Sequence, residues 1–210
     1  MSVATGKVAA MTERRDFGVM SAPQFVLPAD RPLTVADLDL TPDDGCRYEL
    51  DDGVLVVSPA PVTIHQRVLH RLEVLLEAAC PPEFEVLPGP GVELSEIQYR
   101  IPDLVVVRSA SIGVTDKNVT SPPELVVEIA SPSTASYDQG RKKTVYAQFG
   151  IPAYWIVVPN PNQPSLTAYA LTRDTYAEVG RAAGEQHFAA ATPFPVEIVP
   201  SALVTARWRR

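Results

Sequence analysis

Leu125-Val-Val-Glu-Ile-Ala-Ser-Pro132 is the stretch of the 210-residue sequence that decides the predicted fold class. Its first five residues form a continuous apolar run that only Glu128 interrupts, and such a run is typical of a strand buried on both faces of a sheet. Two runs of the same kind, Leu104–Val107 and Ala153–Val158, lie before and after it in the chain. These runs predict the centre of a sheet that helices cover on both sides.

Two helices are expected to cover that sheet. The first spans about Ile64–Ala79, because apolar side chains recur there at helical spacing and Cys80-Pro-Pro82 stops the helix. The second spans about Tyr137–Phe149 and ends at Gly150, the residue type that most often follows a helix. A shorter helix is expected to run from an N-cap at Thr34 through residue 39.

Further strands complete the predicted sheet. Tyr48–Ser58 predicts a hairpin, since Asp51-Asp52-Gly53 is turn chemistry between two strand-like runs. The remaining strands are expected at Phe84–Leu87, Gly91–Leu94, Ser165–Leu171 and Tyr176–Val179. This order predicts an α/β fold with a central mixed sheet flanked by helices and an N-terminal hairpin, and it excludes a regular βαβ series and an all-β sandwich.

Length and composition predict one domain. The hydrophobic fraction is 46% and the charged fraction is 20%, which are ordinary values for a globular protein. We expect the domain to span residues 31–200, with a disordered N-terminal extension over residues 1–30 and a tail over residues 201–210. No apolar run suits a membrane span and the first 30 residues lack the apolar core of a signal peptide, so a cytoplasmic protein is expected.

The net charge of −7 argues against a broad basic surface for non-specific binding of nucleic acid. An acidic total remains compatible with a local basic groove, or with metal ions that supply positive charge. Cys46 and Cys80 lie far apart without metal-ligand spacing, and both are expected to be free thiols.

Two carboxylates enter the predicted sheet in apolar surroundings. Asp103 stands where the run Leu104–Val107 begins, and Glu128 lies inside the run Leu125–Ile129. A buried, unpaired carboxylate is costly, so each must be protonated, paired with a cation or bound to a metal. Carboxylates on adjacent strands would repel each other, and a cation such as Mg²⁺ resolves that repulsion while keeping water and phosphate as further ligands.

The helix after Glu128 supplies a third charged group. Lys142 and Tyr146 are spaced by four and share one helix face, from which Lys142 can point back toward the carboxylates. An ammonium there would stabilise charge on a phosphate or orient the attacking water. Structural alternatives stay open: Asp103 in a turn, Glu128 in an ion pair with Lys142 or Arg141, and Lys142 as a solvated helix residue.

Several motifs in a fixed order resemble the Uma-two family of bacterial restriction endonucleases. They are Tyr48-Glu-Leu-Asp-Asp-Gly53, Ser58-Pro59 with His65-Gln66, Pro102-Asp103, Val126-Val-Glu-Ile-Ala-Ser-Pro-Ser-Thr134, Asp138 with Lys142 and Tyr146, and Gly150-Ile-Pro-Ala-Tyr-Trp155. The resemblance covers about residues 34–200. It implies the PD-(D/E)XK restriction-endonuclease-like fold and Mg²⁺-dependent cleavage of DNA phosphodiesters, with Mn²⁺ as an alternative ion.

The same resemblance assigns roles to individual residues. It makes Asp103 and Glu128 the metal-binding and catalytic carboxylates. The chain departs from the superfamily pattern at Ala130, where the lysine of the E-x-K element would stand. The resemblance moves the catalytic role of that lysine to Lys142 and away from Lys143, which lies about 100° further around the helix.

Three further residues are supporting candidates. Glu49 is similar to an acidic residue that this superfamily often carries in its first elements, as a metal ligand or beside one. His65 stands in the first turn of the long helix, where a role near the site competes with a capping or exposed position. Tyr146 either hydrogen-bonds within the site or packs against the sheet.

Functions of different classes remain open. One is an Mg²⁺-dependent endonuclease with a DNA substrate, for which a homodimer is one expected form by analogy with nucleases that cut both strands. Another is a non-catalytic binding or regulatory module on the nuclease fold, which the acidic net charge and the missing E-x-K lysine favour. A hydrolase of another phosphoester is a third hypothesis.

Overall fold

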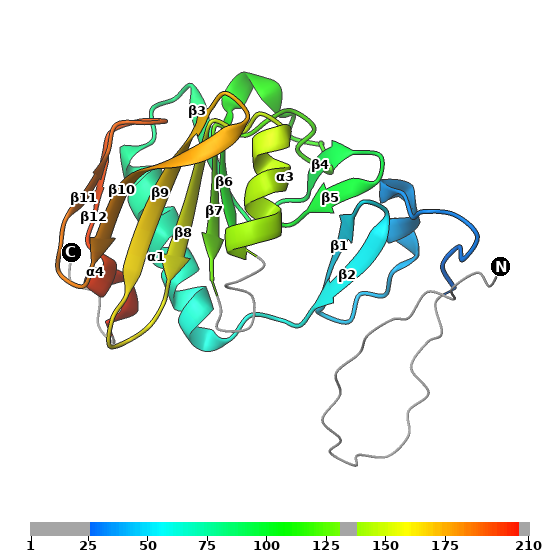
Figure 1. Ribbon diagram of the computed structural model, residues 1–210, viewed down its shortest axis with the longest axis horizontal. Helices are drawn as coiled ribbons and strands as arrows, with labels where there is room; N and C mark the ends of the chain where they lie inside the picture. The colour runs from blue at the N-terminus through cyan, green and yellow to red at the C-terminus, as the bar shows by residue number, and fades with distance from the viewer. Residues whose placement is uncertain (1–25, 131–137, 206–210) are drawn as a thin grey trace, which may run out of the picture.

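The centre of the computed structural model, which describes residues 26–130 and 138–205, is a six-stranded mixed sheet (Figure 1). The strand order is β10-β9-β8-β7-β6-β3, with β7 and β8 parallel and the other neighbouring pairs antiparallel. The strands are β3 (Phe84–Pro88), β6 (Leu104–Arg108), β7 (Leu125–Ile129), β8 (Ala153–Val158), β9 (Ser165–Thr172) and β10 (Thr175–Ala183). The predicted α/β fold with a mixed central sheet is confirmed, and the bounds of β7 and β8 equal the predicted apolar runs.

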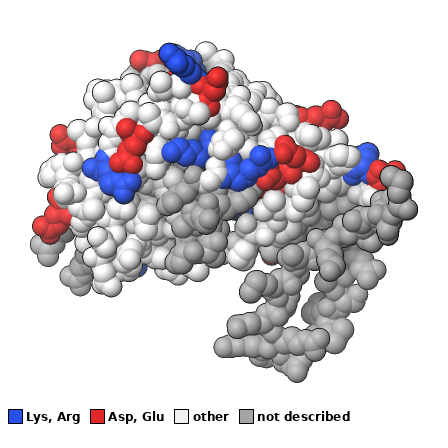
Figure 2. All heavy atoms as spheres, in the orientation of Figure 1, with Lys and Arg blue, Asp and Glu red and all other residues white. Residues whose placement is uncertain are grey.

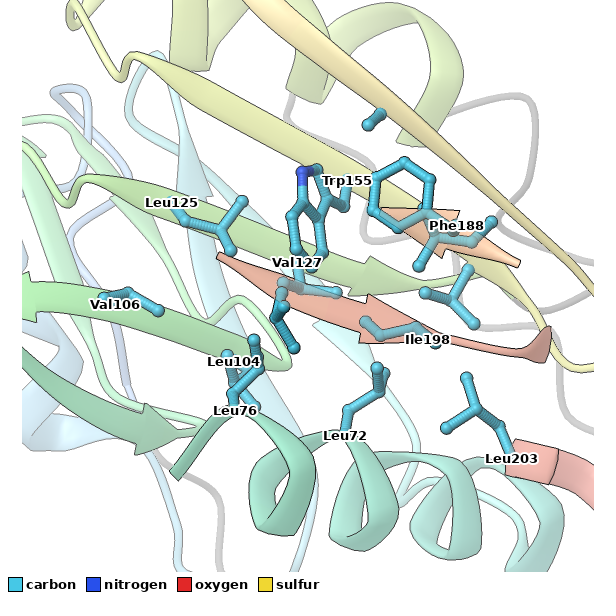
Figure 3. Close-up of a cluster of buried hydrophobic side chains, with 14 of the residues drawn as sticks. Leu72, Leu76, Leu104, Val106, Leu125, Val127, Trp155, Phe188, Ile198 and Leu203 are labelled. Atoms are coloured by element: carbon cyan, nitrogen blue, oxygen red, sulfur yellow. The ribbon is translucent and has the colours of Figure 1, made fainter. Parts of the chain in front are cut away.

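One face of this sheet is covered by α1 (Thr63–Ala79), which begins one residue before the predicted helix. Its apolar stripe is buried, since Leu72 and Leu76 have no exposed surface and point toward Leu104 and Val127 of the sheet (Figure 3). Burying a leucine side chain contributes about 1.5–3 kcal/mol. This stripe therefore fixes α1 on the sheet.

The opposite face is covered by a helix of two parts. η3 (Asp138–Lys142) is a π-helix and continues into α3 (Lys143–Gln148), where a single helix over residues 137–149 was predicted. Residue 137 lies outside the described residues. Gly150 follows the helix with φ +79°, which agrees with the predicted end. A π turn holds one more residue than an α turn, and the apolar spacing of the sequence does not reveal it.

A second sheet of order β2-β1-β5-β4 carries the predicted N-terminal hairpin. Its strands are β1 (Arg47–Asp51), β2 (Val54–Ser58), β4 (Val92–Ser95) and β5 (Gln98–Arg100). β1 and β2 are joined by Asp52 and Gly53, whose φ values of 51° and 75° suit a two-residue hairpin turn. β5 was not predicted, because three residues are too few to show a strand period.

The C-terminal elements close the core beside α1. β11 (Phe188–Ala190) and β12 (Val196–Ile198) form a small antiparallel sheet, and α4 (Pro200–Val204) follows them. Leu203 of α4 is 1% exposed and belongs to the same core cluster as Leu72. The predicted tail over residues 201–210 therefore begins inside a packed helix, and its last five residues lie outside the described residues.

Two short 3-10 helices complete the described elements. η1 (Val35–Leu40) lies where a short helix was predicted, and Thr34 forms a capping box with Asp37. η2 (Ser109–Ser111) lies in the connection between β6 and β7. Residues 1–25, most of the predicted N-terminal extension, lie outside the described residues. Among the described helices, none combines the length and the apolar character that a membrane crossing requires.

Most of the exposed basic side chains among the described residues pair with carboxylates. On the face shown in Figure 2, each group of basic side chains lies next to acidic ones, with uncharged surface between these groups. Both partners are exposed in Lys117–Asp39 and Arg181–Glu178, while exposed Arg31 and Arg108 pair with the less exposed Asp37 and Glu124. This face carries no broad basic surface, which agrees with the expectation from the net charge.

Candidate active site

A pocket of about 510 Å³ opens where β6 begins and where the parallel strands β7 and β8 end. Its volume lies in the range of roughly 300–1,000 Å³ that is typical of ligand sites. Its charged lining consists of Arg47, Glu49, His65, Asp103, Glu128 and Lys142. The structure therefore brings together five of the six site residues predicted from the sequence and adds Arg47 to them.

Strand register explains why Asp103 and Glu128 meet. β6 and β7 are antiparallel, and Leu104 pairs with Val127. One further step along this register sets Asp103 opposite Glu128, so the two side chains point to the same face of the sheet. The backbone N–H of Ile129 donates to Oδ2 of Asp103 at 2.8 Å, so the aspartate side chain extends the bonding between the two strands.

Asp103 is 2% exposed and is held by two basic side chains. Arg47 donates from Nη1 to Oδ1 at 2.6 Å, and Nε2 of His65 lies 2.9 Å from Oδ2. Burial acts to raise the pKa of Asp103, but the hydrogen bond and charge of His65 and the charge of Arg47 outweigh it, so the pKa lies below its usual range. Asp103 is therefore an ionised carboxylate at neutral pH.

Glu128 is 3% exposed and is held from the helix side. Its Oε1 accepts hydrogen bonds from Nζ of Lys142 at 2.9 Å and from the hydroxyl of Tyr146 at 2.7 Å. Burial and the nearby charge of Glu128 raise the pKa of Tyr146 well above its ordinary value, so the phenol remains a hydrogen-bond donor. The sequence left open an ion pair between Glu128 and Lys142. The structure has this ion pair, and both residues line the pocket.

The side chains of Lys142 and its neighbour Lys143 contact different residues. Lys142 is the last residue of η3 and is buried in the pocket, where Nζ also lies 3.9 Å from Oε1 of Glu49. Lys143 instead holds its ammonium 3.6 Å from the ring centroid of Tyr169, on the far side of the helix turn. The choice of Lys142 as the lysine nearest the carboxylates agrees with this arrangement.

Glu49 reaches the pocket from the hairpin strand β1. It is 5% exposed, and its Oε1 accepts the backbone N–H of Ile101 at 2.7 Å. That bond ties β1 to the segment just before Asp103, so Glu49 has a structural role as well as a position in the pocket. In the pocket it lies beside Lys142, which also pairs with Glu128.

Two charged groups near the site were missed or misplaced in the sequence analysis. Arg47 was missed, because its partner Asp103 lies 56 positions further along the chain and no local pattern links them. Arg141, considered as a partner of Glu128, instead pairs with Asp51 at 2.7 Å and with Asp52 in the hairpin turn. Arg141 and Lys142 are adjacent in sequence, so their side chains leave the helix in different directions and reach different partners.

The donor chemistry of the pocket fits a hard divalent cation. Asp103 and Glu128 offer carboxylate oxygens, and Mg²⁺ commonly uses one or two protein carboxylates and completes its shell with water and phosphate. Among the described residues, no three or more His, Cys, Asp or Glu side chains converge as a ready-made metal site. Arg47, His65 and Lys142 already pair with the two carboxylates, so an ion must compete with them.

Comparison with known proteins agrees with this fold. Residues 35–202 match the model of the Uma2 family, which carries the description "Putative restriction endonuclease". The chain belongs to the Uma2 family. The resemblance stated from its motifs is thereby confirmed, and the protein is a member of a family of nuclease type. No curated protein matched the sequence.

A solved structure shares the fold of this Uma2 protein. It is described as a "putative nuclease belonging to DUF820" from Anabaena variabilis. The TM-score is 0.64, and the match covers 82% of this chain and 98% of that chain at 14% sequence identity. At this identity the likeness shows the shared fold.

Proposed function

We propose that this Uma2 protein is an Mg²⁺-dependent endonuclease that hydrolyses DNA phosphodiester bonds, with Mn²⁺ able to replace Mg²⁺. The observation that supports it most is that Asp103 and Glu128, from two neighbouring strands, line one pocket with Lys142. Three buried ionisable groups at one end of a sheet are expensive to assemble for stability alone, and such clusters are typical of functional sites.

Asp103 and Glu128 are the residues that would hold the metal. A bound Mg²⁺ supplies positive charge against the phosphate and lowers the pKa of a coordinated water. The chain's own residues prepare the place for it. His65 orients Asp103, and Tyr146 orients Glu128, each through one hydrogen bond or ion pair that fixes the carboxylate.

Arg47 and Lys142 are the cations that would face the scissile phosphate. Each now pairs with one carboxylate, at 2.6 Å and 2.9 Å. If Asp103 and Glu128 held a metal ion, Arg47 and Lys142 would face the non-bridging oxygens of the phosphate. Preorganised cations that meet developing negative charge are among the largest sources of catalysis. Arg47 adds a planar fork of donors that suits a phosphate group.

The direct test is cleavage of a supercoiled plasmid and of a single-stranded circular DNA by Asp103→Asn and Glu128→Gln variants in Mg²⁺ or Mn²⁺. Both amides keep the size of the carboxylate, and Asn can still accept the N–H of Ile129. Loss of a metal ligand is expected to lower the rate about a thousandfold. Glu178→Gln, at the exposed pair with Arg181, is the matched control and should cut like the wild type. Undiminished cutting by either site variant would refute the proposal.

A second candidate is a non-catalytic binding or regulatory module with the nuclease fold. The observation that favours it is that both carboxylates already have cationic partners, so the site is compensated without a metal. Calorimetric titration separates the two candidates. If the protein is the proposed nuclease, it should bind Mg²⁺ or Mn²⁺ with a dissociation constant in the millimolar range or lower. The Asp103→Asn variant should lose this binding. A wild-type protein that takes up neither ion would favour the module.

A further inference from the structure

The pocket of the candidate active site combines its charged residues with an apolar part that two loops provide. Pro59 and Pro61 lie in the connection after β2, and Pro159 and Pro161 lie in the connection after β8. Val62, which also lines the pocket, is 65% exposed. A site that only held a metal and a phosphate would need none of these apolar surfaces.

Exposed apolar surface beside buried charged side chains indicates a ligand that has both an apolar part and a charged part. Pro59 and Pro161 are exposed at the rim, while Lys142 and Asp103 are buried in the same pocket. Covering apolar surface stabilises a complex by roughly 25 cal/mol per Å². A nucleotide matches this division, because its phosphate is anionic and its base has flat apolar faces that stack on apolar side chains.

The rest of the described surface does not favour a base-paired duplex. Binding of duplex DNA depends on basic side chains that neutralise many phosphates along both strands. The net charge is −7, and the basic side chains at exposed positions pair largely with carboxylates. In a duplex the faces of each base are covered by its neighbours, so a pocket with apolar walls gains nothing from them. An unpaired nucleotide presents both base faces to such walls.

We propose that this pocket receives one unpaired nucleotide of a single-stranded polynucleotide, with the phosphate toward Arg47 and Lys142 and the base against the prolines of the two loops. The pocket volume of about 510 Å³ suits one ligand of this size. This inference rests on the proposed function and adds its substrate class: a strand end, a loop or a melted segment in place of intact duplex. The four prolines are positioning residues, since they touch the base and not the reacting phosphate.

The first experiment compares three fluorescent DNA probes with equal numbers of phosphates, by anisotropy with the full chain. The probes are a single strand, a blunt hairpin duplex and a single strand whose bases are replaced by abasic sites. Binding is measured in EDTA and again with Ca²⁺. The single strand is expected to bind at least about tenfold tighter than the other two probes, the order that stacking of one base supplies. Equal affinity for the single strand and the duplex, or for the normal and the abasic strand, would overturn the inference.

Variants of the proline walls provide the second arm. Pro59→Ser and Pro161→Ser are each expected to weaken binding of the normal strand by roughly fivefold and to leave binding of the abasic strand unchanged. Pro122→Ser is the matched control, because Pro122 is an exposed proline before β7, at the other end of that strand. Thermal unfolding shows whether each variant is folded. Pocket variants that are folded and bind like Pro122→Ser would contradict the assignment of the base to the proline walls.

The outcomes separate this inference from the proposed function. Metal-dependent cutting that the Asp103→Asn variant loses, together with equal affinities for strand and duplex, would retain the nuclease and reject the unpaired nucleotide. A preference for the single strand in a protein that cuts no substrate in any metal would retain the unpaired nucleotide and reject the nuclease.

Discussion

Tyr146 and Tyr176 are two buried tyrosines that each donate one hydrogen bond, to Oε1 of Glu128 and to the backbone carbonyl of Ile151, respectively. Burial raises the pKa of both phenols, so both hydroxyls keep their protons at neutral pH. Removing each hydroxyl by a Tyr→Phe substitution therefore allows a direct comparison of the two residues. One hydroxyl orients a carboxylate of the candidate site, and the other only satisfies the backbone.

Tyr146→Phe and Tyr176→Phe should differ in activity more than in stability. Losing a hydrogen bond to an ionised carboxylate costs about 1.5–3 kcal/mol, and losing one to a carbonyl costs about 1 kcal/mol. Urea unfolding measures both. Only Tyr146→Phe is expected to slow metal-dependent cleavage, by about tenfold or more, because it frees Glu128 to rotate. Equal activity of the two variants would show that the Tyr146 hydroxyl has a structural role alone.

At the scale of residues, the sequence revealed the acids of the site better than the bases. Glu128 stood out because a carboxylate inside an apolar strand is unusual, and Asp103 through its place where a buried run begins and through the family motif. Arg47 did not stand out, because an arginine at the start of a hairpin has no distinctive neighbours. Lys142 was recognisable through its helical spacing and the family resemblance. Which base meets which acid is a property of the assembled sheets and could not be predicted from local sequence.

At the scale of elements, Asp51 connects the hairpin to the π-helix. Arg141 of η3 and Arg100 of β5 both reach its Oδ1, at 2.7 and 2.8 Å. Burial acts to raise the pKa of Asp51, but the hydrogen bonds from Arg141 and Gln98 and the nearby Arg100 lower it below its usual range. This contact holds the strand that carries Glu49 against the turn that carries Lys142, and so it sets the relative position of two pocket walls.

Asp51→Asn should therefore reduce stability in a pH-dependent way. Because the folded pKa is depressed, the ionised carboxylate stabilises the fold above the unfolded value of about 3.9, and this contribution is lost as the pH falls through the folded pKa. Urea unfolding should show a deficit of roughly 1–3 kcal/mol at pH 7. That deficit should narrow below about pH 4. A deficit that stays constant from pH 7 to pH 3 would mean that the charge of Asp51 contributes nothing.

Elements were predictable where one period dominated the sequence. β7 and β8 are apolar on both faces, so their bounds followed directly from the runs. α1 followed from its stripe and its proline stop. η3 could not be predicted, because a π turn changes the hydrogen bonding of a helix without changing its residue types. β5 could not be predicted either, since its three residues depend on pairing with β1 and β4.

At the scale of the molecule, α4 returns to the core that α1 and the sheet form. Leu203 is buried there, and Arg71 of α1 donates from Nη1 to the carbonyls of Ala202 and Leu203 at 3.0 and 2.9 Å. The family match also extends to residue 202. The predicted boundary at residue 200 rests on interpreting the residues up to Trp208-Arg-Arg210 as a frayed end. Tertiary contacts with α1 determine the helix instead.

Leu203→Ala should be one of the more damaging core substitutions in the chain. Truncating a fully buried leucine costs about 2–5 kcal/mol, depending on how far the cavity collapses. Val114→Ala, at a fully exposed position, is the control and should change the free energy of unfolding by less than about 0.5 kcal/mol. Urea unfolding at neutral pH measures both. A loss below about 1 kcal/mol for Leu203→Ala would show that the packing of Leu203 contributes little to stability.

The register between β6 and β7 has a consequence for how the chain can change in length. One inserted or deleted residue inside either strand would turn the side chains beyond it to the other face, and Asp103 and Glu128 would part. The exposed residues 113–116 of the connection between β6 and β7 can gain or lose residues at little energetic expense, since closing a somewhat longer loop adds only tenths of a kcal/mol. Related chains should therefore differ in the length of that connection. The positions of the two carboxylates relative to β6 and β7 should stay constant.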